Sequence, residues 1–284
     1  MTKFDGKTCL ITGAASGLGR ATAFAAAAKG ASLVLTDITA DALATTAEEL
    51  RATGATVHLA HAADVSDHSA VVGLAAHTFE AVGHVDIVMN VAGIATWGTV
   101  DKLTPQQWRR TVDINLMGPI HVIEEFVRPM ITAGRGGHLV NVSSAAGIFG
   151  LPWHAPYSAT KFGLRGISEV LRFDLRRHKI GVSLVCPGAM ATPMADTIDI
   201  AGVDRDNAAL QKAIGLFMRH AVTPDQAATA VIKGVERNRY WVYTSRDIQF
   251  AHWGQRYFPY GYTLAMRGLN NAMTNYATKN ALVR

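Results

Sequence analysis

The chain has 284 residues, a length at which a single large domain buries most of the surface that its unfolded state exposes. Hydrophobic residues make up 49% of the sequence and charged residues 17%, which excludes a disordered polyelectrolyte and favours an α/β protein whose sheet is covered by helices on both faces. The net charge of +5 comes from scattered Lys and Arg residues without a long basic run, so we expect no nucleic-acid partner.

Short apolar runs alternate along the chain with longer stretches of helical period. The strands are predicted at residues 8–12, 32–36, 56–60, 85–90, 137–142, 181–186 and 240–244. The helices are predicted at residues 18–29, 40–53, 66–82, 108–131, 158–178 and 224–237. This alternation predicts a single doubly wound α/β domain, with a seven-stranded, mainly parallel sheet and helices on both faces.

Hydroxyl residues mark several helix starts. Ser66 precedes one predicted helix, and a Thr-Pro pair provides a capping hydroxyl and a proline at residues 104–105 and 223–224. No internal repeat, low-complexity linker or shift in composition divides the chain. We therefore expect one main domain over residues 1–245, followed by a C-terminal extension over residues 246–284.

The cysteines and the first residues bear on the cellular compartment. Cys9 and Cys186 are each flanked by apolar residues, so we expect buried free thiols, as in a reducing cytoplasm. No Cys/His cluster has ligand spacing, so no metal is expected. The N-terminus lacks the apolar core of a signal peptide, and Lys29 interrupts the alanine-rich stretch from Ala21 before it could span a bilayer. These features predict a cytoplasmic protein without a transmembrane segment.

A glycine-rich turn, T-G-A-A-S-G-L-G at residues 12–19, joins the first predicted strand to a helix. Glycines at such a turn let the backbone bend sharply and approach a pyrophosphate, and the helix N-terminus supplies amide donors. An ordinary strand-to-helix turn is the alternative, but the strand before it and the helix after it favour a dinucleotide. The expected cofactor contacts in this turn are Gly13, Ser16, Gly17, Leu18 and Gly19.

Acidic residues follow the next two predicted strands. Asp37 lies 18 residues beyond Gly19 (37 − 19), close to the spacing at which a carboxylate receives the ribose hydroxyls of NAD, and its charge would repel the 2′-phosphate of NADP. The alternative for Asp37 is a cap on the following helix. Asp64 and Val65, after the third strand, either contact adenine or belong to the cap of the next helix.

Small residues end the fourth predicted strand, at N-V-A-G over residues 90–93. They would let a cofactor lie against the carboxyl edge of the sheet, where folds of this kind bind ligands. The contacts expected here are Asn90, Ala92 and Gly93, although the same residues alone also fit a simple turn.

The sharpest feature is Y-S-A-T-K at residues 157–161, preceded by a serine pair at the end of the fifth strand. Tyr157 and Lys161 are four residues apart and share one face of a helix. A free phenol has a pKa of about 10, so its phenolate costs roughly 4 kcal/mol at neutral pH, and a nearby cation reduces that cost. The pattern predicts proton transfer by Tyr157, with Ser144 bonding to the substrate oxygen. A polar strand end beside an exposed helix face is the alternative.

Asn115 is a polar residue among apolar ones in the helix predicted over residues 108–131. Such a position fits either a role in helix packing or a role in holding a water molecule.

In combination, these motifs resemble the short-chain dehydrogenase/reductase family over about the first 245 positions. The matching positions are residues 12–19, residues 90–93, Asn115, Ser144, Tyr157, Lys161 and Pro187-Gly188. The resemblance implies a Rossmann-type dinucleotide-binding and catalytic domain that oxidises an alcohol or reduces a ketone. It makes Tyr157 the acid/base and has Ser144 orient the substrate oxygen. Lys161 would bind the nicotinamide ribose and lower the pKa of the tyrosine, and Asn115 would hold the water of a proton relay.

The resemblance also bears on the cofactor. Pro187, Gly188 and Thr192 would border the nicotinamide, with Thr192 bonding to its carboxamide. Asp37 marks a preference for NAD over NADP, and the neighbouring Ile38, a further expected contact, brings no positive charge that would favour NADP.

Two departures from the family pattern stand out. Val91 occupies a position where many members have a second asparagine, with little consequence expected, and the chain continues beyond the length of the usual compact member. The family expectation for assembly is a homodimer or homotetramer, formed through the helices that contain Asn115 and Tyr157.

Substrate contacts are expected on the loops that follow the strands, at residues 94–97, 148–154 and 190–217. These loops are mostly apolar or aromatic, so we expect a bulky, apolar secondary alcohol or its ketone as the substrate. The residues expected to converge near Tyr157 are Trp97, Phe149, Trp153 and Met194.

The extension after residue 245 combines aromatic and basic residues, which fits packing against the same domain, a lid over the pocket, a subunit contact or a peripheral membrane contact. The residues concerned are Phe250, Trp253, Tyr257, Phe258, Tyr260 and Tyr262, with Arg246, Arg256 and Arg267.

Two other functions remain alternatives at this point. A ketoreductase that prefers NADPH differs only in its cofactor. A non-catalytic nucleotide-binding redox sensor would retain the cofactor site, but the presence of Ser144, Tyr157, Lys161 and Asn115 argues against it.

Overall fold

The computed structural model describes residues 2–203, 207–218 and 221–280. Its main sheet has seven strands in the order β3-β2-β1-β4-β6-β7-β9, and every pair of neighbours is parallel. The strands are β1 (Thr8–Thr12), β2 (Ser32–Asp37), β3 (Val57–Ala62), β4 (Ile87–Asn90), β6 (Gly137–Val142), β7 (Ile180–Cys186) and β9 (Trp241–Tyr243). The predicted doubly wound α/β fold is confirmed.

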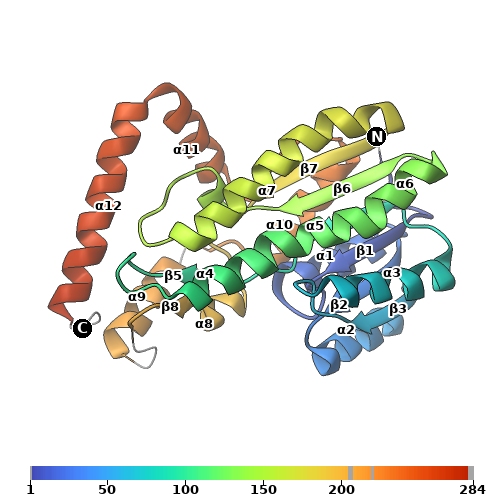
Figure 1. Cartoon of the computed structure of the whole chain (residues 1–284), viewed down its shortest axis with the longest axis horizontal. Helices are drawn as coiled ribbons and strands as arrows, with labels where there is room; N and C mark the ends of the chain where they lie inside the picture. Colours follow the sequence, from blue (N-terminus) through green and yellow to red (C-terminus); the bar gives the residue numbers. More distant parts are fainter. Residues whose placement is uncertain (1, 204–206, 219–220, 281–284) are drawn as a thin grey trace.

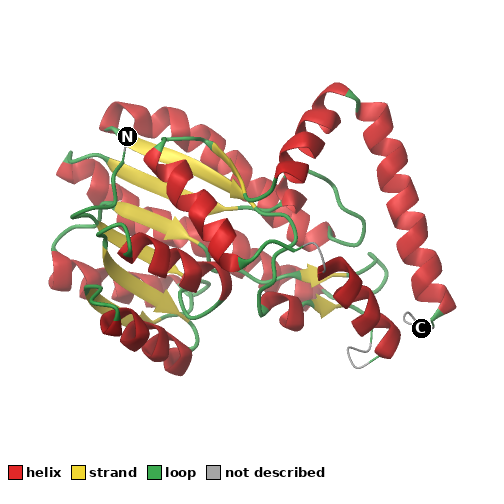
Figure 2. Ribbon diagram, turned by 180° about the vertical axis from the view of Figure 1, so that it is seen from behind, coloured by secondary structure: helices red, strands yellow, loops and turns green. Residues whose placement is uncertain are grey.

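The order of the strands predicts a crevice at the carboxyl edge of the sheet. The chain lays β2 and β3 on one side of β1 and then crosses to place β4 on its other side. Ligands of open α/β sheets bind at such a switch point, outside the carboxyl ends of the strands. Figure 2 shows the strand arrowheads directed toward the side of the molecule where the C-terminal helices lie.

Helices cover both faces of the sheet (Figure 1) because side chains of each strand alternate between two cores. Cys9 and Ile11 pack into one core with residues of α1 (Gly17–Ala27), α2 (Ala40–Ala52) and α10 (Pro224–Glu236). Leu10 packs into the other core, with α3 (His68–Val82), the helix after β5, and α7 (Ala155–Asp174).

The helix after β5 is longer than predicted. It runs without interruption through α4 (Pro105–Val112), α5 (Gly118–Val122) and α6 (Arg128–Ala133), joined by two wide π-type turns at Asp113–Met117 and Ile123–Val127. The Thr104 hydroxyl caps the first turn of α4 in a capping box with Gln107. The long helix therefore begins at the Thr-Pro pair and not at Trp108.

The prediction that Ser66 begins the third helix is wrong. Asp67 is the capping residue of α3, because its carboxylate accepts a hydrogen bond from the Ser69 N–H at 2.9 Å. The Ser66 hydroxyl is instead bound to Asp64, so the turn before the helix uses it.

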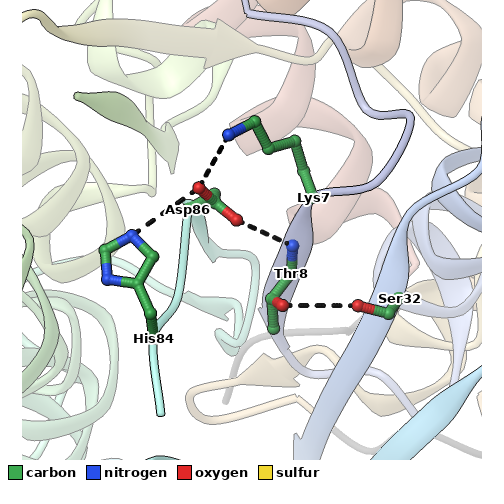
Figure 3. Close-up of polar contacts among 5 residues, drawn as sticks. All are labelled: Lys7, Thr8, Ser32, His84 and Asp86. Atoms are coloured by element: carbon green, nitrogen blue, oxygen red, sulfur yellow. Dashed lines mark hydrogen bonds and ion pairs between the residues drawn. The ribbon is translucent and has the colours of Figure 1, made fainter. Parts of the chain in front are cut away.

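The amino ends of the central strands are tied together away from the crevice (Figure 3). The buried Asp86 carboxylate, just before β4, receives Lys7 Nζ at 2.9 Å and the Thr8 N–H at 3.0 Å, and His84 Nε2 lies 3.6 Å away. The Thr8 and Ser32 hydroxyls are 3.3 Å apart and link the starts of β1 and β2. This network fixes β1, β2 and β4 relative to one another.

A second, two-stranded sheet lies beyond the carboxyl edge and was not predicted. It pairs β5 (Thr96–Trp97) with β8 (Asp199–Ile200). In the sequence, β8 follows α8 (Met194–Thr197) and precedes α9 (Ala208–Met218). Its strands have two residues each, which is too short for a pattern of alternating hydrophobicity to appear.

Two helices end the described chain, α11 (Arg246–Tyr257) and α12 (Pro259–Lys279). They form an arm that stands apart from the layered core in both views (Figures 1 and 2). α11 has no buried residue, and Ala277 is the one buried residue of α12 in the described part of the chain. Within the described residues, no helix combines the length and hydropathy needed to cross a bilayer.

Candidate active site

The glycine turn between β1 and α1 is too tight for side chains. Gly13 has a φ of +67°, and a Cβ there would lie 2.9 Å from the Cα of Ala92. A Cβ on Gly19 would overlap the carbonyl oxygen of Gly13. Ser16 and Leu18 flank the start of α1, where free N–H groups gather. The turn therefore presents bare backbone at the carboxyl edge of the sheet.

Asp37 lies against this turn. Its carboxylate accepts the Ala15 N–H at 3.0 Å and the Thr39 N–H at 3.0 Å. The N-cap position of α2 is occupied by Thr39, whose side chain makes no capping hydrogen bond, and not by Asp37. The side chain of Ile38 is exposed beside it.

Asp64 and Val65 have local contacts. Asp64 Oδ1 accepts bonds from the N–H and the hydroxyl of Ser66 at 2.9 and 2.7 Å. The buried Val65 packs against Gly118, where a Cβ would come within 2.8 Å of Val65 Cγ2. These contacts shape the turn after β3, at the same edge as Asp37.

The segment after β4 is held by a residue of β1. The Thr12 hydroxyl oxygen accepts the N–H groups of Val91 and Ala92, both at 3.0 Å. Asn90 donates from Nδ2 to Asn141 Oδ1 at 2.9 Å. The buried Oδ1 of Asn90 has no hydrogen-bond partner among the described residues.

These supports were missed by sequence reasoning. The sequence motif includes Thr12 but does not indicate its role as a hydrogen-bond acceptor. Nor does the sequence indicate that Asn141, the partner of Asn90, donates a second hydrogen bond to the Ser168 hydroxyl at 2.9 Å. The available signal was a polar side chain, Asn141, which follows the apolar residues Leu139 and Val140 in the same strand.

Tyr157 and Ser144 meet at the end of β6. Tyr157 lies in the first turn of α7, and its hydroxyl is near that of Ser144. Burial raises the pKa of Tyr157 above its ordinary value, and the interaction with Ser144 offsets this rise in part. The lowering of this pKa that was expected from Lys161 is therefore not found. Ser144 also accepts the Ala146 N–H at 3.1 Å, which fixes its side chain.

Lys161 lies one turn further along α7 and is buried. Its Nζ is 5.6 Å from the centroid of the Tyr157 ring and donates to the Val142 carbonyl at 3.0 Å. Burial lowers the pKa of Lys161 to about 8. At neutral pH most of these side chains therefore carry a positive charge beside the phenol.

Asn115 lies in the wide turn between α4 and α5 and is fully buried. Its amide group exchanges two bonds with the backbone of Ile94, both at 2.8 Å. A Cβ on Gly93 would lie 3.0 Å from Asn115 Oδ1 and 3.4 Å from Lys161 Nζ, so the three residues are close neighbours. The side chain thus performs a packing role, fastening the segment after β4 to the long helix.

The loop after β7 closes the other side of the crevice. The Pro187 carbonyl accepts the Ala145 N–H at 2.7 Å, and Gly188 packs against Ile248 of α11. Thr192 lies over the glycine turn, because a Cβ on Gly17 would be 3.3 Å from Thr192 Cβ. The loop therefore spans from the end of β6 to the dinucleotide turn.

Three of the four expected substrate residues gather near the tyrosine. Trp97, Trp153 and Met194 pack in one apolar cluster with Tyr157. Phe149 packs in a different cluster, with its ring centroid 6.3 Å from that of Tyr262. The pocket stretch predicted at 190–217 includes residues 204–206, which lie outside the described residues.

His154 is a neighbour of the tyrosine that sequence reasoning missed. Its ring centroid is 4.5 Å from that of Trp97 and 6.4 Å from that of Tyr157. Its Nδ1 is 2.6 Å from the Pro152 carbonyl, and burial lowers its pKa. A neutral imidazole therefore lines the same cluster.

Comparison with known proteins agrees with this geometry. A family model described as short chain dehydrogenase matches residues 7–201. SadH of Mycobacterium tuberculosis is 35% identical over 243 residues, which cover 84% of this chain and 86% of SadH. The 1-deoxy-11-beta-hydroxypentalenate dehydrogenase of Streptomyces avermitilis is 34% identical over 246 residues, which cover 85% of this chain and 86% of that enzyme.

Solved structures show the same similarity. The crystal structure of a short chain dehydrogenase/reductase from Burkholderia phymatum in complex with NAD has a TM-score of 0.82 and 31% identity, and the match covers 90% of this chain and 95% of that chain. A metagenomic short-chain oxidoreductase in complex with NADP has a TM-score of 0.68 and 28% identity, and the match covers 85% of this chain and 96% of that chain. The family model alone spans more than half of the sequence. The chain therefore belongs to the short-chain dehydrogenase/reductase family of NAD(P)-dependent oxidoreductases.

Proposed function

We propose that this enzyme transfers a hydride between NAD and a bulky, apolar secondary alcohol or the corresponding ketone, with Tyr157 as the acid/base. The observation that carries the proposal is the placement of the Tyr157 hydroxyl near that of Ser144, with Lys161 Nζ 5.6 Å from the centroid of the Tyr157 ring. These three groups lie at the carboxyl edge of the sheet, beside the segment that carries Gly93.

The residues around the crevice fit a nicotinamide dinucleotide. The glycine turn is packed too closely for side chains and presents bare backbone, which suits a pyrophosphate, and the buried Oδ1 of Asn90 has no hydrogen-bond partner among the described residues. When bound, NAD would supply the hydride acceptor for the carbinol carbon in oxidation, and NADH would supply the hydride donor in reduction. The residues that would hold the cofactor on the nicotinamide side are Lys161, Pro187, Gly188 and Thr192.

Tyr157 handles the proton in this proposal. In ketone reduction its hydroxyl donates a proton to the substrate oxygen, and the raised pKa keeps that proton in place at neutral pH. In alcohol oxidation the tyrosine oxygen accepts the hydroxyl proton, and the positive charge of Lys161 stabilises the phenolate needed for this. Ser144 holds the substrate oxygen against the tyrosine through its own hydroxyl.

The walls near the tyrosine support an apolar substrate. Trp97, Trp153 and Met194 pack against the same apolar cluster as Tyr157, and they offer aromatic and thioether surface. Preference for small charged polyols in a substrate panel would overturn this part of the proposal.

The experiment that tests the function is absorbance at the reduced-nicotinamide band, with a panel of secondary alcohols and with NAD and NADP separately. We expect NADH formation, faster with large apolar alcohols than with small polyols. Cofactor binding without turnover of any alcohol or ketone in a broad panel would favour a redox sensor over the dehydrogenase.

Asp37 supports NAD over NADP in the same proposal. Its carboxylate is fixed by two backbone N–H groups beside the glycine turn, where a 2′-phosphate would meet its charge. Replacement Asp37→Ala is expected to lower the ratio of kcat/KM for NAD over NADP by at least about tenfold, which corresponds to roughly 1.4 kcal/mol. Asp41→Ala, an exposed carboxylate in the first turn of α2, is the matched control. An unchanged ratio in the Asp37 variant would favour the NADPH ketoreductase.

We further propose that the enzyme assembles as a homodimer or homotetramer through the outer surfaces of the long helix and α7. The exposed apolar side chains of Phe162, Val170 and Phe173 on α7 support this contact. Sedimentation of a concentration series should show one species larger than the monomer, and replacing Val170 and Phe173 by Lys should convert it to monomer.

A further inference from the structure

A cavity of about 510 Å³ lies between the C-terminal arm and the loops beside the active site. Val100, Leu151, Trp153 and Ser158 line it from the domain side. Asn270 and Thr274 of α12 line it from the other side. The volume is within the range of small-molecule pockets.

Two tyrosine hydrogen bonds hold α12 over this cavity. The Tyr262 hydroxyl accepts the Gly150 N–H at 2.9 Å, and the Tyr276 hydroxyl donates to the Ala209 carbonyl at 2.8 Å. Ala277 is buried in the apolar cluster that contains Tyr157. Because the two tyrosines lie on either side of Asn270 and Thr274 in the helix, the wall of the cavity is fastened at both ends.

The cavity adjoins the reacting groups. Trp153 lines the cavity and packs against the same apolar cluster as Tyr157. The next residue, His154, has its ring centroid 6.4 Å from that of Tyr157. The segment that carries Trp153 and His154 is therefore a neighbour of both the cavity and the tyrosine.

The residues that line the cavity indicate which kind of ligand fits it. In the described part of the chain, the residues lining the cavity are all uncharged. Three of them, Thr99, Asn270 and Thr274, have polar side chains that can form hydrogen bonds with a polar group of a ligand. The cavity therefore fits an apolar group that carries a hydroxyl or carbonyl and no formal charge.

We propose that this cavity is a distal substrate subsite, which receives the large substituent of the secondary alcohol, and that Asn270 and Thr274 of α12 determine which substituents fit. The inference rests on the proposed function and adds the substrate class: secondary alcohols whose large substituent is uncharged, with an apolar body and a polar end. It also gives the C-terminal arm a role as one wall of the subsite.

The chain offers matched pairs of residues for the test. Asn270→Trp fills the cavity, whereas Asn271→Trp places the same side chain at the next position, which is exposed and does not line the cavity. Thr274→Trp and Thr278→Trp form a second pair of the same kind. Circular dichroism melting of all four variants checks that each one is folded.

The kinetic probes, each used with NAD, are a small alcohol, butan-2-ol, and two alcohols with a large substituent, 4-(4-hydroxyphenyl)butan-2-ol and 4-(4-carboxyphenyl)butan-2-ol. We expect Asn270→Trp and Thr274→Trp to raise the KM for the hydroxyphenyl alcohol at least tenfold, while the KM for the small alcohol and the affinity for NAD stay unchanged. The unaltered enzyme should prefer the hydroxyphenyl alcohol to the carboxyphenyl alcohol. Equal KM values for the hydroxyphenyl alcohol within each matched pair would overturn the subsite.

A binding measurement keeps the subsite separate from the catalytic proposal. Calorimetric titration of 4-(4-hydroxyphenyl)butan-2-one should show binding that Asn270→Trp weakens at least tenfold and Asn271→Trp does not. Binding that follows this pattern without any turnover would support the subsite and contradict the dehydrogenase. Equal binding by both variants, or no binding to either variant or to the unaltered enzyme, would contradict the subsite.

Discussion

Replacing His138, a fully buried histidine of β6, should remove part of the pH dependence of stability. Its Nε2 is 2.9 Å from the Ser183 hydroxyl and its Nδ1 is 3.4 Å from the Thr2 hydroxyl. Burial lowers the pKa of His138 to about 4, whereas an unfolded histidine has a pKa of about 6.5. Below pH 6.5 the unfolded chain therefore binds a proton that the folded chain does not, and the free energy of unfolding falls as the pH drops from about 6.5 to about 4.

The size of this effect follows from the two pKa values. A difference of about 2.5 pKa units corresponds to roughly 3 kcal/mol, fully present above pH 6.5 and lost by about pH 4. Urea unfolding at pH 8 and pH 5, followed by circular dichroism, measures the part that is lost above pH 5, roughly 2 kcal/mol. His138→Gln should be less stable than the unaltered enzyme at pH 8 and should lose less on acidification. The exposed His58→Gln is the control. An equal loss between pH 8 and pH 5 in all three proteins would refute the reasoning.

Two further substitutions test the supports of the site. Gly19→Ala forces the glycine turn open, so the Kd for NAD measured by fluorescence titration should rise at least about tenfold, whereas Gly73→Ala, where a Cβ meets open space, should leave it unchanged. Asn115→Leu leaves the N–H and C=O of Ile94 without their partner, so the free energy of unfolding should fall by about 2 kcal/mol or more. Unaltered unfolding curves would show that the Asn115 amide is not structural.

The main sheet could be predicted from the sequence because each of its seven strands is a compact apolar run with a helix-length stretch beside it. Some strand ends differ from the prediction by one or two residues. β4 begins at Ile87, although the backbone of Asp86 already forms hydrogen bonds with Thr8 and His138. The pairing of β5 with β8 brings together segments about 100 residues apart, and no local sequence pattern predicts such a contact.

The position of the site could be predicted for those of its residues that lie at the carboxyl ends of strands. Ser144, Asp37 and Asn90 meet at one edge because parallel strands present their carboxyl ends together. Tyr157 could be placed beside Ser144 by its family resemblance, but the direction of its pKa shift depends on burial, which the sequence does not encode locally. Phe149, expected near the tyrosine, turns instead toward Tyr262 of α12.

The proton-transfer role of the phenol is tested most directly by Tyr157→Phe, with Tyr260→Phe on the exposed surface of α12 as the control. Cofactor affinity is measured by titration and the chemical step by single-turnover absorbance with an alcohol that the unaltered enzyme oxidises. The account predicts that Tyr157→Phe binds NAD with unchanged affinity and slows hydride transfer by about 10²–10⁴-fold, while the control reacts at the full rate. A single-turnover rate in Tyr157→Phe within twofold of the unaltered enzyme would contradict it.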